Sequence, residues 1–143
     1  MGHLRVFMLL PLLVACSGTV DLQVSGSADK GIIFKLSSDD AKKFETGFKF
    51  YVMESGAVSN GELKTIMWEI ELFKRNEWLN FKQDYIEKWA YGIQPNGFNE
   101  IVKPKPLVLN TNYYYSMSGG RGYSGAGCFY LDDKRKVVNS LSC

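Results

Sequence analysis

The chain has 143 residues, with 17 lysines and arginines against 15 acidic residues and a formal net charge of +2 at neutral pH. This length fits one domain that can bury a core, and the balanced charge excludes the basic surface that nucleic-acid binding needs. The single histidine is His3, so the body of the chain has no imidazole for Ser-His-Asp or Cys-His catalysis, or for His-ligated zinc.

Residues 1–15 have the pattern of a signal peptide. Arg5 provides a basic start, and residues 6–15 carry no charge. An apolar run of this length is too short to cross a bilayer, which takes about 20 helical residues. We therefore expect this segment to direct export and to be removed. No later apolar stretch approaches membrane-spanning length.

Residues 13–16, Leu-Val-Ala-Cys, resemble a bacterial lipobox. The resemblance implies cleavage after Ala15 and lipid on the sulfur and the new amine of Cys16. Each buried lipid CH2 contributes roughly 0.8 kcal/mol, so two or more chains would anchor the protein stably to an envelope membrane. By resemblance to enterobacterial sorting, Ser17 in place of Asp favours the outer membrane. An ordinary secretory signal with a chance cysteine is the alternative.

Two cysteines remain once Cys16 carries lipid, and these are Cys128 and Cys143. Outside the cytoplasm such a pair is expected to form a disulfide. Closing the loop between them predicts about 3 kcal/mol of stabilisation from chain entropy, and the bond would hold the end of the chain. Two free thiols are the alternative.

Residues 16–30 are rich in Ser, Gly and Asp, with only a brief alternation of Val20, Leu22 and Val24. This composition predicts a lipidated tether that ends in a first strand. The domain organisation we expect is a signal peptide over 1–15, a tether over 16–30 and one folded domain over 31–143.

Alternating apolar residues predict strands from residue 31 onward. The alternation is clearest over residues 32–36, 48–53, 65–73, 113–117 and 128–131. Clusters of Gly, Asn, Pro and Asp between these stretches predict turns. About seven short strands separated by turns predict a mainly β fold, a single antiparallel β-sandwich with one or two short helices.

Two stretches carry helix signals. Residues 37–45 open with Ser-Ser-Asp-Asp, a suitable N-cap. In residues 76–89 aromatic residues recur at helical spacing, but aromatics are mediocre helix formers and Gly92 follows closely, so a short helix and an ordered loop both stay open. The recurring residues are Trp78, Phe81, Tyr85 and Trp89.

Residues 107–117 resemble the penultimate strand of a fibronectin type III domain, an immunoglobulin-like sandwich. The matching residues are Leu107, Thr111, Tyr113, Tyr115 and Met117. The resemblance implies that Tyr113 is a tyrosine-corner residue whose hydroxyl bonds to nearby backbone. It also implies that Trp68 is the core tryptophan of an earlier strand.

A second resemblance is to small lipoproteins of Gram-negative bacteria, a group without an assigned activity. It is carried by Tyr91-Gly92, Pro95, Gly97-Phe98, Pro104 and Pro106-Leu107, ahead of the tyrosine-rich strand. This resemblance implies fold and location only, because a fold does not define a function.

Residues 120–125, Gly-Arg-Gly-Tyr-Ser-Gly, match the dinucleotide-binding glycine pattern. That chemistry needs a helix N-terminus after the glycines, whereas a strand is predicted here, so we expect no cofactor. A hairpin loop is the preferred interpretation. The alternative is a binding loop in which Arg121 and Tyr123 contact a partner.

The acidic pairs at 39–40 and 132–133 are expected in a helix cap and a turn, because calcium takes about six oxygens or more. Glu69 and Glu71 are two apart on a strand and therefore share a face. We interpret them as a solvated face, with carboxylate catalysis as the alternative. Trp78 and Phe81 are expected to cover an edge of the sandwich; if they protrude, they become anchors for a protein or glycan.

Together these patterns predict a lipoprotein held on the bacterial envelope through Cys16, facing the periplasm or the outside. We expect a non-enzymatic binding or structural module that acts through an envelope or secreted protein partner, without cofactor, metal or nucleic acid. The alternative is a hydrolase of glycan or peptidoglycan that uses only carboxylates. It would need acids such as Glu54, Glu69, Glu71 and Asp84 to share a cleft.

Overall fold

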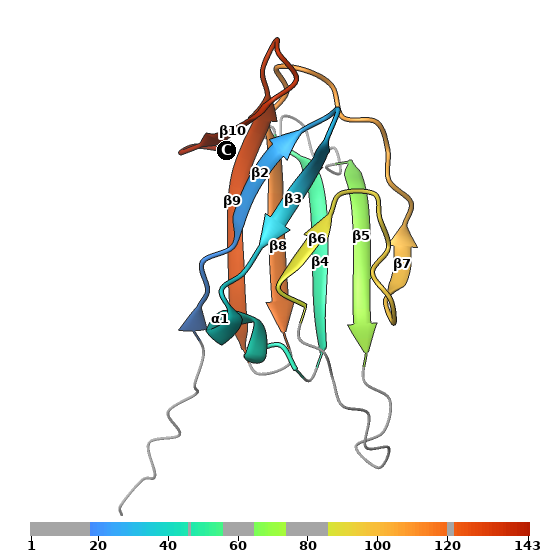
Figure 1. Ribbon diagram of the computed structural model, residues 1–143, viewed down its shortest axis with the longest axis vertical. Helices are drawn as coiled ribbons and strands as arrows, with labels where there is room; N and C mark the ends of the chain where they lie inside the picture. The colour runs from blue at the N-terminus through green and yellow to red at the C-terminus, as the bar shows by residue number, and fades with distance from the viewer. Residues whose placement is uncertain (1–17, 46, 56–64, 74–85, 120–121) are drawn as a thin grey trace, which may run out of the picture.

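The computed structural model describes residues 18–45, 47–55, 65–73, 86–119 and 122–143. Within these ranges the chain forms ten strands and one short helix (Figure 1). In chain order they are β1 Gly18–Thr19, β2 Gln23–Ser27, β3 Gly31–Lys35, α1 Ser38–Lys42, β4 Gly47–Glu54, β5 Ile66–Phe73, β6 Lys88–Ala90, β7 Asn99–Val102, β8 Tyr113–Gly119, β9 Tyr123–Leu131 and β10 Val137–Ser140. The mainly β fold predicted from the alternation is confirmed.

The strands form two sheets. The larger has the order β1-β9-β8-β4-β5-β7, with β10 also paired to β9, and the smaller has the order β2-β3-β6. Figure 1 shows the smaller sheet lying across one face of the larger, so the arrangement is an open sandwich. Strand pairs are antiparallel, as predicted, with the exception of β1 and β9, which run parallel.

The core lies between the two sheets, because every second residue of β4, β5 and β8 points toward the smaller sheet. Phe34 of β3 contacts the rings of three strands of the larger sheet, with centroids 4.7 to 6.2 Å away. Its partners are Phe50, Tyr115 and Phe129. Trp68 of β5 is fully buried, which agrees with the core position implied by the resemblance.

The prediction of a tether over residues 16–30 is wrong from residue 18 onward. β1 pairs with β9 and β2 pairs with β3, and Val20, Leu22 and Val24 are buried. The Ser- and Gly-rich composition indicated a loop, but pairing with distant strands supplies the hydrogen bonds that local propensity lacks. The described part of the folded domain therefore starts with β1 at Gly18, well ahead of residue 31.

The first predicted helix is confirmed in a shorter form. In α1 the Ser37 side-chain oxygen accepts a hydrogen bond from the Asp40 N–H at 3.1 Å, which is an N-cap. Of the second stretch, residues 76–85 lie outside the described residues, and Trp89 lies in β6 rather than in a helix. No helix in the described ranges is long and apolar enough to cross a bilayer.

Candidate functional site

A groove crosses the outer face of the smaller sheet at β6, with a volume of about 310 Å³. We call it the β6 groove. Its walls come from β3, from β6 and from the segment that follows β6. The lining residues are Ile33, Lys88, Trp89, Ala90, Ile93 and Pro95. The walls are largely apolar, and Ile93 is 66% exposed.

The position of β6 is set by its central residue, Trp89, and by Tyr91, which directly follows the strand. Trp89 points inward, where its ring packs against Phe34, Phe48 and Phe50. The Tyr91 hydroxyl donates to the carbonyl oxygen of Lys105 at 2.7 Å, and it lies 3.1 Å from the carbonyl oxygen of Met67. Burial raises the pKa of this hydroxyl far above its ordinary value. The groove floor is therefore fixed to the larger sheet.

The wall after β6 depends on a turn. Gly92 has φ of +76°, a left-handed conformation that glycine adopts at little cost, and the Ile93 N–H donates to the Ala90 carbonyl oxygen at 3.1 Å. This turn directs the chain back beside β6 and leaves Ile93 exposed. The apolar wall is therefore a consequence of backbone geometry at a single glycine.

Two lysines lie directly opposite each other at one end of the groove. Lys35 of β3 pairs with Lys88 of β6, and both are exposed. In the adjacent pair the Leu36 N–H donates to the Glu87 carbonyl oxygen, so Lys35 and Lys88 occupy a non-hydrogen-bonded position, where facing side chains come closest.

Within the described residues, no ion pair compensates the charge of this lysine pair. Like charges directly opposite on a sheet destabilise it. The β6 groove thus combines exposed apolar walls with a local excess of positive charge. It can accept an apolar side chain together with a neighbouring carboxylate.

The residues that the sequence singled out for partner binding do not form this site. Tyr123 lies half-buried at the start of β9, next to α1, with the Lys43 ammonium 5.2 Å from the centre of its ring. Arg121, Trp78, Phe81 and Cys16 lie outside the described residues.

Cys128 and Cys143 are paired in the structure, with their Cα atoms 5.6 Å apart. This separation lies inside the range of native disulfides. Cys128 is buried on β9, and Cys143 follows β10. The pairing that was expected from the cysteine count is therefore compatible with the fold.

Glu69 and Glu71 share the outer face of the larger sheet, as the strand spacing predicted, but the interpretation as a solvated face is wrong for Glu69, which is buried. The Glu69 side chain is only 7% exposed, and its carboxylate lies 2.6 Å from the Lys49 ammonium. The hydrogen bond that the Lys49 ammonium donates to the Glu69 carboxylate raises the pKa of Lys49. Glu54 ends β4 and is exposed, and Asp84 is not among the described residues. The Glu69–Lys49 contact has the geometry of a structural ion pair.

The remaining acidic pairs have the turn and cap positions that were expected. Asp39 and Asp40 lie in the first turn of α1. The Asp132 carboxylate accepts hydrogen bonds from the N–H groups of Lys134 and Lys136 at 2.9 and 2.8 Å in the turn before β10. Among the residues that the structure describes, no group of histidine, cysteine and acidic residues could hold a metal ion.

The β6 groove was not predicted, although part of its signal is visible in the sequence. Ile33 occupies a position of β3 that alternation assigns to the solvent face, where an apolar residue is unusual. The opposing residues Lys88 and Ala90 could not be recognised, because the pairing of β3 with β6 joins segments more than fifty residues apart. Comparison of the chain with protein-family models, with curated proteins and with solved structures finds no match.

Proposed function

We propose that this chain is a lipid-anchored β-sandwich of the bacterial envelope that binds a protein partner and catalyses no reaction. The lipobox-like residues 13–16 support the anchor, and Ser17 supports the outer membrane as its location. A disulfide between Cys128 and Cys143 is compatible with such an oxidising compartment. The tyrosine corner at Tyr113 supports a fibronectin type III-like class of sandwich.

The observation that carries the binding role is the β6 groove with its unpaired lysines. Exposed apolar surface next to a charge of one sign favours a partner that is apolar and carries the opposite charge. The partner chemistry is therefore an extended peptide segment in which an apolar side chain is flanked by Asp or Glu. The apolar side chain contacts Ile33 and Ile93, and the carboxylates neutralise Lys35 and Lys88.

No specific observation favours the carboxylate hydrolase. Glycoside hydrolysis needs two carboxyl groups on either side of a bound substrate. Glu69 is instead buried against Lys49, and Lys49 also lies opposite Glu71 in the strand register. Among the described residues, the lining of the β6 groove includes no acidic side chain.

A peptide titration tests the binding role. The full lipidated protein, in detergent micelles, is mixed with a hexapeptide of alternating Leu and Glu or with its Leu and Lys counterpart, and methyl NMR follows Ile33 and Ile93. We expect both methyl signals to shift with the Leu–Glu peptide. Two exposed ion pairs of up to about 1 kcal/mol each predict a preference of roughly tenfold over the Leu–Lys peptide.

Charge reversal provides the control. Lys35→Glu combined with Lys88→Glu should invert the preference between the two peptides, whereas Lys30→Glu combined with Lys134→Glu should leave it unchanged, because those lysines lie in turns away from the groove. Equal binding of both peptides, or shifts that spare Ile33 and Ile93, would rule out the groove as the binding site.

A further inference from the structure

We infer that the end of the sandwich formed by β1, α1 and the start of β9 rests on the phospholipid headgroups of the membrane that anchors the protein. The inference depends on the proposed lipid on Cys16. It adds an orientation, because the structure determines which end of the domain lies beside that lipid.

The chain joins the folded domain almost immediately after Cys16. β1 begins at Gly18, where Gly18 and Thr19 pair with Tyr123 and Ser124 of β9. The Val20 N–H then donates to the Ser124 carbonyl oxygen at 2.9 Å. A Cβ atom on Gly18 would lie 2.9 Å from the Tyr123 ring, so this ring lies directly against the backbone of the first strand.

The spacer between lipid and domain is therefore very short. Two residue steps separate Cys16 from Gly18, and an extended chain spans at most about 7 Å over two residues. The fifteen-residue tether expected over 16–30 would have allowed the domain to move well away from the bilayer. With β1 paired to β9, the domain end beside Gly18 stays within a few ångströms of the headgroup layer.

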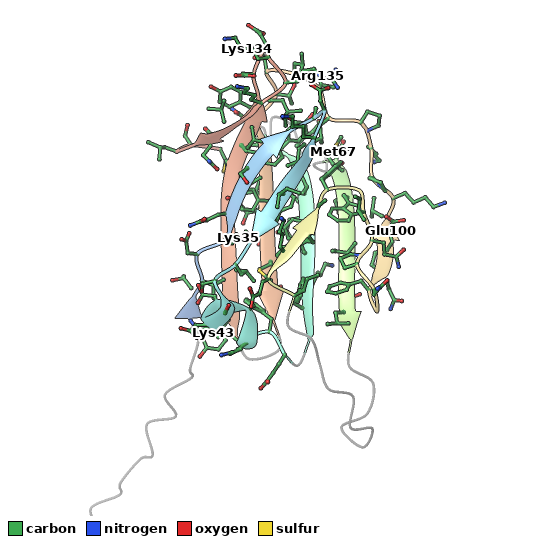
Figure 2. The ribbon with its side chains drawn as sticks, viewed as in Figure 1. Lys35, Lys43, Met67, Glu100, Lys134 and Arg135 are labelled. Carbon is green, nitrogen blue, oxygen red and sulfur yellow. A yellow bond between two sulfur atoms is a disulfide. The ribbon has the colours of Figure 1, made fainter. Side chains whose placement is uncertain are left out.

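The two ends of the domain are well separated. Figure 1 shows β1 and α1 at one end and the turn between β9 and β10 at the other. Figure 2 places Lys43 at the first end and Lys134 and Arg135 at the second. β9 contains nine residues, and at about 3.4 Å per residue it spans roughly 27 Å between these ends.

The chemistry of the Gly18 end fits an interfacial position. Tyr123 is partly exposed there with Lys43 over its ring, and tyrosine rings are favoured at headgroup level. Lys42 and Lys43 pair with Asp39 and Asp40, so α1 adds little net charge and the acyl chains provide the attachment.

The short spacer after Cys16, and not the chemistry of the long faces, decides which part of the domain meets the membrane. The outer face of the smaller sheet carries Lys35 and Lys88 beside the apolar Ile33 and Ala90, and that of the larger sheet carries Lys49, Ser116 and Ser118 beside Tyr51 and Tyr114. The lysines on both faces oppose insertion of either face into lipid. The domain therefore stands on its Gly18 end, and the β6 groove stays accessible to a partner.

Spin labels at matched exposed lysines test this orientation. Lys42→Cys near the first end and Lys134→Cys at the other are each labelled in the lipidated full chain, reconstituted in vesicles of phosphatidylethanolamine and phosphatidylglycerol. A lipid that carries a nickel chelate on its headgroup relaxes nearby labels. We expect relaxation to be several-fold stronger at position 42 than at position 134. Equal relaxation, or stronger relaxation at 134, overturns the orientation.

Two further measurements distinguish a failure of this inference from a failure of the proposed function. Mass spectrometry of the N-terminal peptide shows whether Cys16 carries lipid, and an unmodified Cys16 refutes the proposed anchor itself. Insertion of about ten Gly and Ser residues after Ser17 adds a flexible reach of roughly 17 Å. This insertion should lower relaxation at position 42 several-fold; unchanged relaxation means that the short spacer does not hold the domain down.

Discussion

Three consecutive tyrosines at the start of β8 have different surroundings, although they are chemically identical. The Tyr113 hydroxyl accepts a hydrogen bond from the Val108 N–H at 2.8 Å, and the Tyr115 hydroxyl donates to the Leu22 carbonyl oxygen at 3.0 Å. Tyr114 points to the other face, where its ring contacts Tyr51 and its hydroxyl has no hydrogen-bond partner among the described residues. Strand alternation alone produces this difference.

We expect Tyr113→Phe to lower the free energy of unfolding by about 1 kcal/mol, because the Val108 N–H loses its acceptor. Tyr114→Phe is the matched control on the same strand, and a change below about 0.5 kcal/mol is expected for it. Urea unfolding followed by circular dichroism measures both. Equal losses in the two variants would contradict a tyrosine corner at Tyr113.

The Lys49–Glu69 contact joins a half-exposed ammonium to a buried carboxylate, with side chains 47% and 7% exposed. Removing one partner of such a pair leaves the buried charge uncompensated. We expect Lys49→Met to destabilise the fold by about 1 to 2 kcal/mol, a value reduced by the exposure of Lys49 to solvent.

The control for this variant is Lys42→Met, because Lys42 pairs with Asp39 at 3.8 Å on open surface, with side chains 55% and 94% exposed. A change below about 0.5 kcal/mol is expected there. Thermal and urea unfolding of both variants give the comparison. If Lys49→Met is as mild as Lys42→Met, the Glu69 carboxylate is not held by Lys49.

At the scale of elements, β9 explains the glycine pattern that resembled a nucleotide-binding loop. A Cβ on Gly125 would lie 2.8 Å from the Val20 side chain, and one on Gly127 would lie 2.4 Å from the Tyr115 hydroxyl. Gly122 has φ of +79° in the turn before the strand. Gly125 therefore allows Val20 to approach β9 closely, and Gly122 allows the turn, so the structure gives these two glycines of the pattern a structural role; Gly127, just beyond the pattern, makes room for Tyr115.

The link between β9 and the C-terminal tail is the element most sensitive to redox conditions. Cys128 and Cys143 are 15 residues apart, and chain entropy predicts about 3 kcal/mol of stabilisation for such a loop. We expect Cys143→Ser, like reduction of the native protein, to lower the free energy of unfolding by this amount. Chemical unfolding with and without reductant measures it.

The same comparison has an internal control, because reductant should not change the stability of Cys143→Ser. A native protein whose stability is insensitive to reductant would show that Cys128 and Cys143 are free thiols. In that case the Cys143→Ser variant should unfold at the same denaturant concentration as the native protein.

At the scale of the whole molecule, buried hydroxyls predict a loss of stability at high pH. Burial raises the pKa values of Tyr91, Tyr113 and Tyr115 above 10.0, and the hydrogen bond that Lys49 donates to Glu69 raises the pKa of Lys49 above 10.5. Above the unfolded-state pKa, the unfolded chain binds fewer protons than the folded one, so stability falls as pH rises.

We therefore expect urea stability to be nearly constant from about pH 7 to 9 and to fall above about pH 10. Tyrosinate absorbance should rise together with the loss of the circular dichroism signal, because these hydroxyls ionise on unfolding. Replacing Tyr115 by Phe should make the decline shallower. Stability that stays constant to about pH 11 would contradict the burial of these hydroxyls.

The faces of the longer strands could be predicted because each strand carries its own period-two pattern. Phe48, Phe50 and Val52 alternate with more polar neighbours, and they face the core in the structure. β6, β7 and β10 were missed, because strands of three or four residues are too short to show a period. Trp89 fits the helical spacing of residues 76–89, but its pairing with Phe34 in the smaller sheet gives it a strand conformation.

The sequence by itself determined the class of fold, the faces of the long strands, the cysteine pair and the lipobox-like start, because each depends on residues close together in the chain. Only the tertiary structure decided that residues 18–27 belong to the two sheets, that Lys35 faces Lys88, and that Gly18 lies against Tyr123. These contacts join segments far apart in the chain, and a local pattern carries no information about which distant strand will complete its hydrogen bonds.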